Sequence, residues 1–91
     1  MTEIFTGVLL SQPTKGILDD GTYTAYALFQ KDHTFLERLY GAAREAPRDL
    51  RAFNLAAEQL LRCNINDHIR IEGASLGHSK IAAYRVGKID V

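Results

Sequence analysis

The 91-residue sequence lacks tryptophan, contains one cysteine and two prolines, and has no excess of either charge. The lone Cys63 excludes an internal disulfide bond, so we expect a reducing compartment, the cytoplasm. Eleven basic residues balance eleven acidic ones, which argues against a strongly basic protein that coats nucleic acid. A local basic patch would still be enough to bind phosphates. No apolar run approaches the length of a membrane span, and the first residues show no signal-peptide pattern, so we expect no membrane contact.

Apolar residues make up 46% of the chain, which is enough for a compact core. At this length we expect a single domain over residues 1–91. Enrichment in β-forming residues predicts strands at residues 3–11 and 22–30. Alternating apolar and polar positions predict strands at residues 48–53 and 68–76, and the last strand is expected at residues 80–91. Residues 12–21, with Pro13 and Gly16, are expected to form a loop. Asn54 is the expected N-cap of a helix over residues 55–62, and residues 64–67 are expected to turn the chain.

A further helical segment is expected between the second and third strands. Thr34 and Glu37 match a capping box, the pattern in which the two side chains bond to each other's backbone N–H groups. Apolar residues follow at helical spacing, and Pro47 ends the pattern. We therefore predict a helix over residues 35–46, whose apolar positions are Phe35, Leu36, Leu39, Tyr40 and Ala43.

This order of elements is that of the OB-fold. Such a fold is a mainly β, five-stranded Greek-key barrel with a helix between strands three and four; here an extra helical segment lies between strands two and three. If residues 48–53 were not a strand, the order would become ββααββ, an open α+β sheet. The barrel is our prediction.

Three sequence blocks resemble motifs of the single-stranded DNA-binding protein family. GVLLSQP at residues 7–13 is similar to the family's opening G-x-L-x-x-D-P, with Gln12 in place of the aspartate. FNLAAE at residues 53–58 is similar to F-G-K-L-A-E, and IRIEG at residues 69–73 is similar to V-x-V-E-G. GHSKI at residues 77–81 also resembles the short, dimeric primosomal replication protein B branch.

The departures from the family pattern also carry information. The family's tryptophan before strand three and the acidic tail through which bacterial members recruit partners have no counterparts here. The resemblance therefore implies an accessory protein of a plasmid, phage or primosome. Residues 31–47 look helical where the family has a hairpin or loop, which leaves the path of the nucleic acid open.

Single-strand binding needs flat rings for stacking and cations for phosphates. The resemblance aligns Phe53 with a base-stacking phenylalanine, and Phe53 shares a strand face with Arg51; packing in the core is an equal alternative. Tyr26 shares its face with threonines and is expected to be exposed, whereas Tyr23 and Phe29 are expected to fill the barrel. The predicted nucleic-acid-binding residues are Phe53, Arg51, Tyr26, Arg48, Lys80, Tyr84, Arg70 and Lys15, with core packing an equal alternative for Tyr84.

We expect no catalysis, metal or cofactor. His33, His68 and His78 are dispersed, and Cys63 with Asp67 spans a helix end and a turn, which matches neither a nucleophile–base pair nor metal-ligand spacing.

The resulting prediction is a non-catalytic OB-fold protein that binds single-stranded DNA, with RNA as an alternative ligand. It would act as an accessory factor in replication, recombination or repair, as a homodimer or homotetramer, with replication or primosome proteins as partners. The competing hypothesis is a protein–protein interaction module that uses the barrel or the 35–46 helix.

Overall fold

The computed structural model describes residues 2–33, 35–41, 46–77 and 79–89. Their elements follow in the order β1 (Glu3–Leu9), β2 (Thr14–Ile17), β3 (Tyr23–Lys31), α1 (Phe35–Leu39), β4 (Arg48–Phe53), α2 (Leu55–Leu61), β5 (His68–Leu76) and β6 (Lys80–Lys88). Neither helix of the described residues has the length and apolar character needed to cross a membrane.

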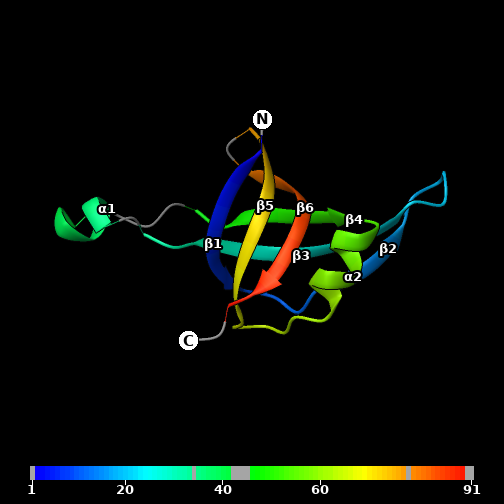
Figure 1. Ribbon diagram of the computed structural model, residues 1–91, viewed down its shortest axis with the longest axis horizontal. Coiled ribbons are helices and arrows are strands. Elements are labelled where there is room, and N and C mark those ends of the chain that lie inside the picture. The colour runs from blue at the N-terminus through cyan, green and yellow to red at the C-terminus, as the bar shows by residue number, and fades with distance from the viewer. Residues whose placement is uncertain (1, 34, 42–45, 78, 90–91) are drawn as a thin grey trace.

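The strands form one sheet that closes on itself. Its hydrogen-bonded order is β1-β5-β6-β4-β3-β2, and an additional pairing of β1 with β3 joins the two sides of the sheet. Strands β4 and β6 run parallel, and the other pairs are antiparallel. Figure 1 shows β2 and the turn after it extending to one side of the barrel, and α1 extending to the other. Closure pairs most of the strand edges that an open sheet would expose.

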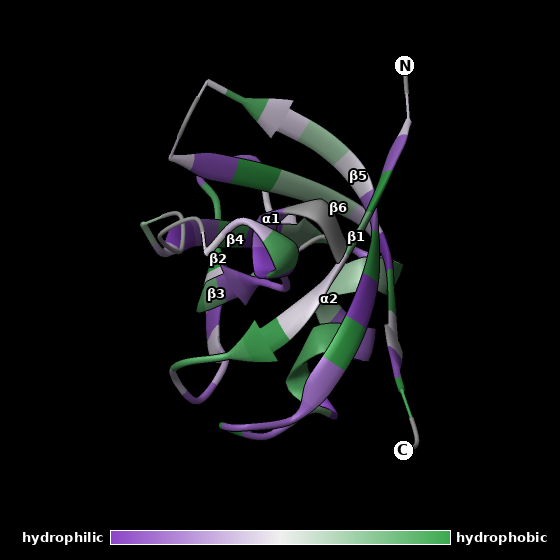
Figure 2. Ribbon diagram, turned by 90° about the vertical axis from the view of Figure 1, so that its left-hand side faces the viewer, coloured by the Kyte–Doolittle hydropathy of each residue, from purple (hydrophilic) through white to green (hydrophobic). Residues whose placement is uncertain are grey.

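The core follows from the alternation of residues along the strands, which Figure 2 shows as alternating hydrophobic and hydrophilic bands. Phe29 is fully buried and Tyr23 packs against the core, as the sequence predicts. Helix α2 closes one end of the barrel with buried Ala56, Ala57 and Leu60. The largest fully buried side chains are Phe29, Leu9, Leu50, Leu60, Ile69, Ile71, Ile81 and Thr24.

Strand β2 corrects the prediction of a loop over residues 12–21. Residues Thr14–Ile17 pair with Tyr23–Tyr26. A turn joins the two strands, in which the Gly21 N–H donates to the Leu18 carbonyl at 2.9 Å and Gly21 has a φ of 86°. The residues of β2 are exposed or half-buried on both faces, so no apolar alternation marks this strand in the sequence.

The helix predicted over residues 35–46 is shorter in the structure. Helix α1 ends at Leu39, and Gly41 adopts a left-handed φ of 68°, with its N–H donating to the Arg38 carbonyl. A glycine in this conformation is a common way to end a helix. Leu39 and Tyr40 are exposed, and α1 contacts no other element of the described chain. The expected capping residue Thr34 and residue Ala43 lie outside the described residues.

Helix α2 starts where the sequence predicts, but Asn54 does not cap it through its side chain. Asn54 occupies the N-cap, but its side chain makes no capping hydrogen bond. Its φ is 52° and its ψ is −120°, a positive-φ conformation outside the left-handed helical region that residues other than glycine rarely adopt. Asn54 therefore provides the sharp bend between β4 and α2. The predicted bounds of β4 and β5 agree with the structure. Strand β6 ends at Lys88, and residues 90–91 of the predicted last strand lie outside the described residues.

Candidate nucleic-acid interface

Four polar or aromatic side chains meet on the outer face of the barrel because of the strand register. Tyr26 on β3 is paired with Arg51 on β4, and Leu28 is paired with Asp49 two residues along. Asp49 is in turn paired with Lys80 across the parallel β4–β6 ladder. Directly paired residues project from the same face of a sheet. Three strands that are distant in sequence therefore place an aromatic ring, two cations and a carboxylate side by side.

These residues surround a pocket of about 490 Å³, here called the outer pocket. Its lining includes Tyr26, Leu28, Asp49, Arg51, Leu76 and Lys80. The volume lies within the ~300–1,000 Å³ typical of ligand sites. Leu28 and Leu76 are exposed, so the pocket combines apolar side chains with charged ones.

Tyr26 and Arg51 form a stacked pair within the outer pocket. The Arg51 guanidinium carbon lies 4.7 Å from the centre of the Tyr26 ring, within the range of a favourable cation–π contact. Tyr26 is half-buried and Arg51 is exposed. The ring also packs over Gly16 of β2, where an added Cβ would stand 2.7 Å from its Cε2 atom. The result is a flat platform with a positive charge, held between three strands.

The charged groups of the outer pocket are not neutralised by partners. Arg51, Lys80 and Asp49 are exposed. Within the described part of the chain, none of the three takes part in an ion pair. The two cations are therefore available to an anionic ligand, and the carboxylate is available to a hydrogen-bond donor.

Phe53 lies on the same outer face as Arg51, which agrees with the face predicted from the sequence. It is half-buried, and it does not line the outer pocket. Phe53 is paired with Thr24, which is fully buried although the sequence placed it on the exposed face. Thr24 is also paired with Gly16. The ring of Phe53 thus lies one row of residues beyond the Tyr26–Arg51 pair.

Tyr84 occupies a β-bulge of β6. Ala83 is paired with Gly73 and Arg85 with Glu72, so Tyr84 is the extra residue between them. Its side chain is 62% exposed, which rules out the core packing that the sequence left open. Such bulges re-aim a side chain; here the bulge turns a tyrosine toward solvent.

The other three predicted cations, Lys15, Arg48 and Arg70, do not line the outer pocket. Lys15 Nζ lies 4.7 Å from the centre of the Tyr23 ring on the opposite face of β3. The Arg48 guanidinium donates to Ser75 Oγ at 3.4 Å and lies 5.9 Å from the Phe5 ring. Arg70 forms an ion pair with Glu72 at 2.9 Å. Each of these three cations already has a partner within the chain.

Sequence reasoning missed Asp49, Leu28 and Leu76. The alternation of β4 could have identified Asp49, because it precedes Arg51 by two residues and shares its face. No local pattern could have placed Leu76 and Lys80 beside Asp49, because that contact depends on the β4–β6 pairing. Among the described residues, no group of three His, Cys, Asp or Glu side chains is placed to hold a metal ion.

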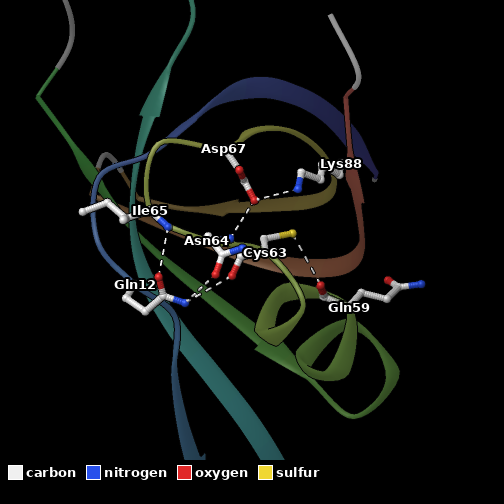
Figure 3. A network of polar contacts seen from close by, with 7 residues as sticks. All are labelled: Gln12, Gln59, Cys63, Asn64, Ile65, Asp67 and Lys88. Atoms are coloured by element: carbon white, nitrogen blue, oxygen red, sulfur yellow. Dashed lines mark hydrogen bonds and ion pairs between the residues drawn. The ribbon is translucent and has the colours of Figure 1, made fainter.

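A separate polar network fastens the bend between β1 and β2 to the turn between α2 and β5 (Figure 3). The Gln12 amide oxygen accepts from the Ile65 N–H at 3.1 Å. Its amide nitrogen donates to the Cys63 carbonyl at 3.4 Å and to Asn64 Oδ1 at 3.3 Å. An aspartate at this position, as in the resembling family, could accept but could not donate. Gln12 therefore joins two segments that are about fifty residues apart in the sequence.

Asp67 and Cys63 complete this network. The Asp67 carboxylate accepts from the Asn64 N–H at 2.7 Å and lies 3.4 Å from Lys88 Nζ. The Asn64 N–H, together with Lys88, holds the pKa of Asp67 below its ordinary value. The buried Cys63 thiol donates to the Gln59 carbonyl at 3.5 Å. Burial, with Asp67 nearby, raises the pKa of the Cys63 thiol, which favours the protonated form over the nucleophilic thiolate.

The sequence matches no protein-family profile, and no curated protein matches it. Solved structures do match. The single-stranded DNA-binding protein from Thermus aquaticus has a TM-score of 0.74 at 16% identity, over 99% of this chain and 40% of that one. A deletion mutant of the same protein gives a TM-score of 0.74 at 15% identity, over 99% of this chain and 41% of that one. The SSB domain of a Synechococcus protein gives 0.70 at 18%, over 93% of this chain and 91% of that one.

The chain has the OB-fold of single-stranded DNA-binding proteins. This confirms the fold class predicted from the sequence, a mainly β barrel with a helix between the third and fourth barrel strands. Strand β2 extends the first barrel strand past the bend at Pro13. The chain spans about two fifths of the length of the Thermus aquaticus proteins that it matches. At these identities the comparison establishes the fold.

Proposed function

We propose that this chain binds single-stranded DNA without catalysis, with the outer pocket at the centre of the binding surface. The observation that carries the proposal is the Tyr26–Arg51 stack beside Lys80, in which the two cations have no ion-pair partner among the described residues. Bases stack on aromatic rings and on guanidinium planes, at ~1–3 kcal/mol per base. The face of OB-folds that carries this pocket is also the one that commonly binds oligonucleotides.

A strand would pass over the outer pocket with its bases toward the platform and its phosphates toward Arg51 and Lys80. Phe53, one row further along β4, would receive a neighbouring base. Tyr84 is exposed at the bulge and is proposed as a more distant stacking contact. Lys15, Arg48 and Arg70, which have partners in the free protein, would contribute only where the nucleic acid displaces those partners.

We further propose an accessory role in replication, recombination or repair, in the cytoplasm, together with replication or primosome proteins. Homodimers or homotetramers would lengthen the binding track, since one OB-fold covers only ~4–16 nucleotides. Stacking on the Tyr26–Arg51 pair does not depend on the sugar, so RNA stays an alternative ligand.

Fluorescence anisotropy with a labelled oligo-dT across a salt series tests the proposal. We expect micromolar or tighter binding that weakens as salt rises, with a slope of about −0.7 per neutralised phosphate for single strands. Arg51→Gln and Lys80→Gln should each make the slope shallower by about that amount. Arg62→Gln is the matched control, because Arg62, which follows α2, is exposed and does not line the pocket. The absence of binding at low salt would refute the proposal.

A protein-interaction role is favoured by one observation. Leu39 and Tyr40 are 63% and 80% exposed, and α1 stands away from the barrel (Figure 1). Such exposed apolar side chains are typical of contact surfaces. If the main function is self-association through α1, wild type should sediment as an oligomer and Tyr40→Ser should sediment more slowly, as a smaller species. In that case labelled DNA should not bind to wild type even at low salt.

A further inference from the structure

Asp49 is the acidic side chain that lines the outer pocket, and it lies where the proposed function brings a polyanion. It is exposed at the surface of β4, paired with Lys80 on one side and Leu28 on the other. Within the described residues it has no ion-pair or hydrogen-bond partner for its carboxylate. A carboxylate here repels phosphate, so it weakens DNA binding unless it makes a favourable contact with another part of the nucleotide.

The chemistry of a carboxylate limits which part of a nucleotide it can contact. An ionised carboxylate accepts hydrogen bonds and cannot donate them. Cytosine and adenine each offer an exocyclic amino group, and guanine offers both an amino group and a ring N–H. Thymine and uracil offer no amino group, and their one ring N–H stands between two carbonyl oxygens. Asp49 would therefore bind an amino group at a base edge more strongly than the ring N–H of thymine or uracil, because the two carbonyl oxygens beside that N–H repel a carboxylate.

The surroundings of Asp49 suit a base rather than a phosphate. Leu28 is 41% exposed and Leu76 is 56% exposed, and both line the outer pocket. Apolar side chains of this kind cover the face of a base and strengthen a charge-assisted hydrogen bond at its edge. Arg51 and Lys80, also in the pocket, attract the phosphates and so direct the base edge toward the carboxylate.

We propose that Asp49 is a specificity-determining residue that makes the outer pocket favour amino-bearing bases over thymine and uracil. This inference rests on the proposed function, because it assigns a preference to the same site. The expected preference for oligo-dC over oligo-dU is about fivefold, near the lower end of what base-edge contacts supply. Both oligonucleotides are pyrimidine strands without the 5-methyl group, so they differ at the base edge that Asp49 would contact.

The test compares labelled oligo-dC and oligo-dU of equal length, at neutral pH and at one low salt concentration, for three proteins. Wild type should prefer oligo-dC. Asp49→Ala should bind oligo-dU more tightly than wild type does, and its ratio of affinities should fall to about one. Glu58→Ala removes the same charge from the exposed surface of α2, outside the pocket, and should keep the wild-type ratio. Urea denaturation of each variant checks that the fold is intact.

Equal binding of the two oligonucleotides by wild type, or an unchanged preference in Asp49→Ala, would overturn the role of Asp49 while leaving DNA binding in place. If neither oligonucleotide binds, the proposed function itself fails and the role of Asp49 fails with it.

Discussion

Gly16 lies against the Tyr26 ring, where a Cβ atom would come within 2.7 Å of the ring carbon Cε2 and 3.0 Å of Thr24 Oγ1. The bare backbone of β2 thus provides the space that the ring occupies on the neighbouring strand. Glycine in a strand often marks such a close approach, and an aromatic ring packed over it compensates for the missing side chain. The position of the ring, and with it the Tyr26–Arg51 platform, depends on the absence of a side chain at residue 16.

Gly16→Ala should weaken single-stranded DNA binding several-fold while changing the stability of the fold little. The added methyl group pushes the Tyr26 ring away from its present position, and the ring has space to move because it faces solvent on one side. Anisotropy titration measures the affinity, and urea denaturation measures the stability. Gly87→Ala is the matched control, since an added Cβ there meets nothing within 4 Å. Equal affinities for the two variants would contradict the dependence of the platform on Gly16.

Gly7→Ala should destabilise the protein by about 3 kcal/mol, the upper end of the usual cost of overpacking. An added Cβ at residue 7 would stand 2.1 Å from the Gln30 carbonyl oxygen and 2.7 Å from Phe29 Cζ. The first of these atoms belongs to the backbone of β3, to which β1 is paired at the closure of the barrel, so no side-chain rotation relieves the clash. Chemical denaturation with urea measures the loss. Gly87→Ala is again the control. A urea midpoint of Gly7→Ala as high as that of Gly87→Ala would contradict the prediction, because the barrel would then accommodate the methyl group without losing stability.

Gln12→Ala should destabilise the protein by about 1 kcal/mol, the usual net value of partly exposed hydrogen bonds. The variant loses the contacts with Ile65, Cys63 and Asn64 that fasten the β1–β2 bend. Gln12→Glu separates the two halves of the interaction, because it keeps the acceptor for the Ile65 N–H and loses the donor. It should lie below wild type in urea midpoint at neutral pH. Unchanged midpoints in both variants would mean that solvent replaces these bonds fully.

Asp67 should make the stability of the fold depend on pH in the acid range. Its folded pKa lies below the unfolded value of about 3.9, so its ionised form stabilises the fold. That contribution is complete above the unfolded pKa and is lost as pH falls through the folded pKa. Asp67→Asn should therefore be less stable than wild type at neutral pH, and the gap in urea midpoint should narrow below about pH 4. A gap that stays constant with pH would contradict the role of the Asn64 N–H and Lys88.

Much of the fold could be predicted from the sequence because the barrel strands are half-buried. β4 and β5 alternate cleanly between core and solvent, so their bounds follow from period-two patterning. β2 could not be predicted, because both of its faces are accessible and its pairing with β3 alone defines it. The sequence overestimates the length of α1 because the apolar spacing continues past Gly41, whose left-handed conformation ends the helix.

The candidate site could be predicted only in part, because some of its contacts depend on pairing between strands that are distant in the sequence. Side chains alternate between the two faces of a strand, and this alternation alone predicts that Tyr26 and Arg51 point outward. The meeting of Asp49 with Lys80 depends on a parallel ladder between residues about thirty positions apart, which no short pattern reports. The sequence does not decide whether Tyr84 lies in the core or at the surface, because a bulge in β6 changes the alternation of that strand.

The central claim is that bases stack on the Tyr26–Arg51 platform. Its most direct test is the affinity of Tyr26→Ala and Tyr26→Phe for a labelled single-stranded oligonucleotide at low salt. Since stacking contributes ~1–3 kcal/mol per base, Tyr26→Ala should bind about ten- to a hundredfold more weakly than wild type, while Tyr26→Phe, which keeps the ring, should bind nearly as well. Wild-type affinity in a folded Tyr26→Ala protein would contradict the account.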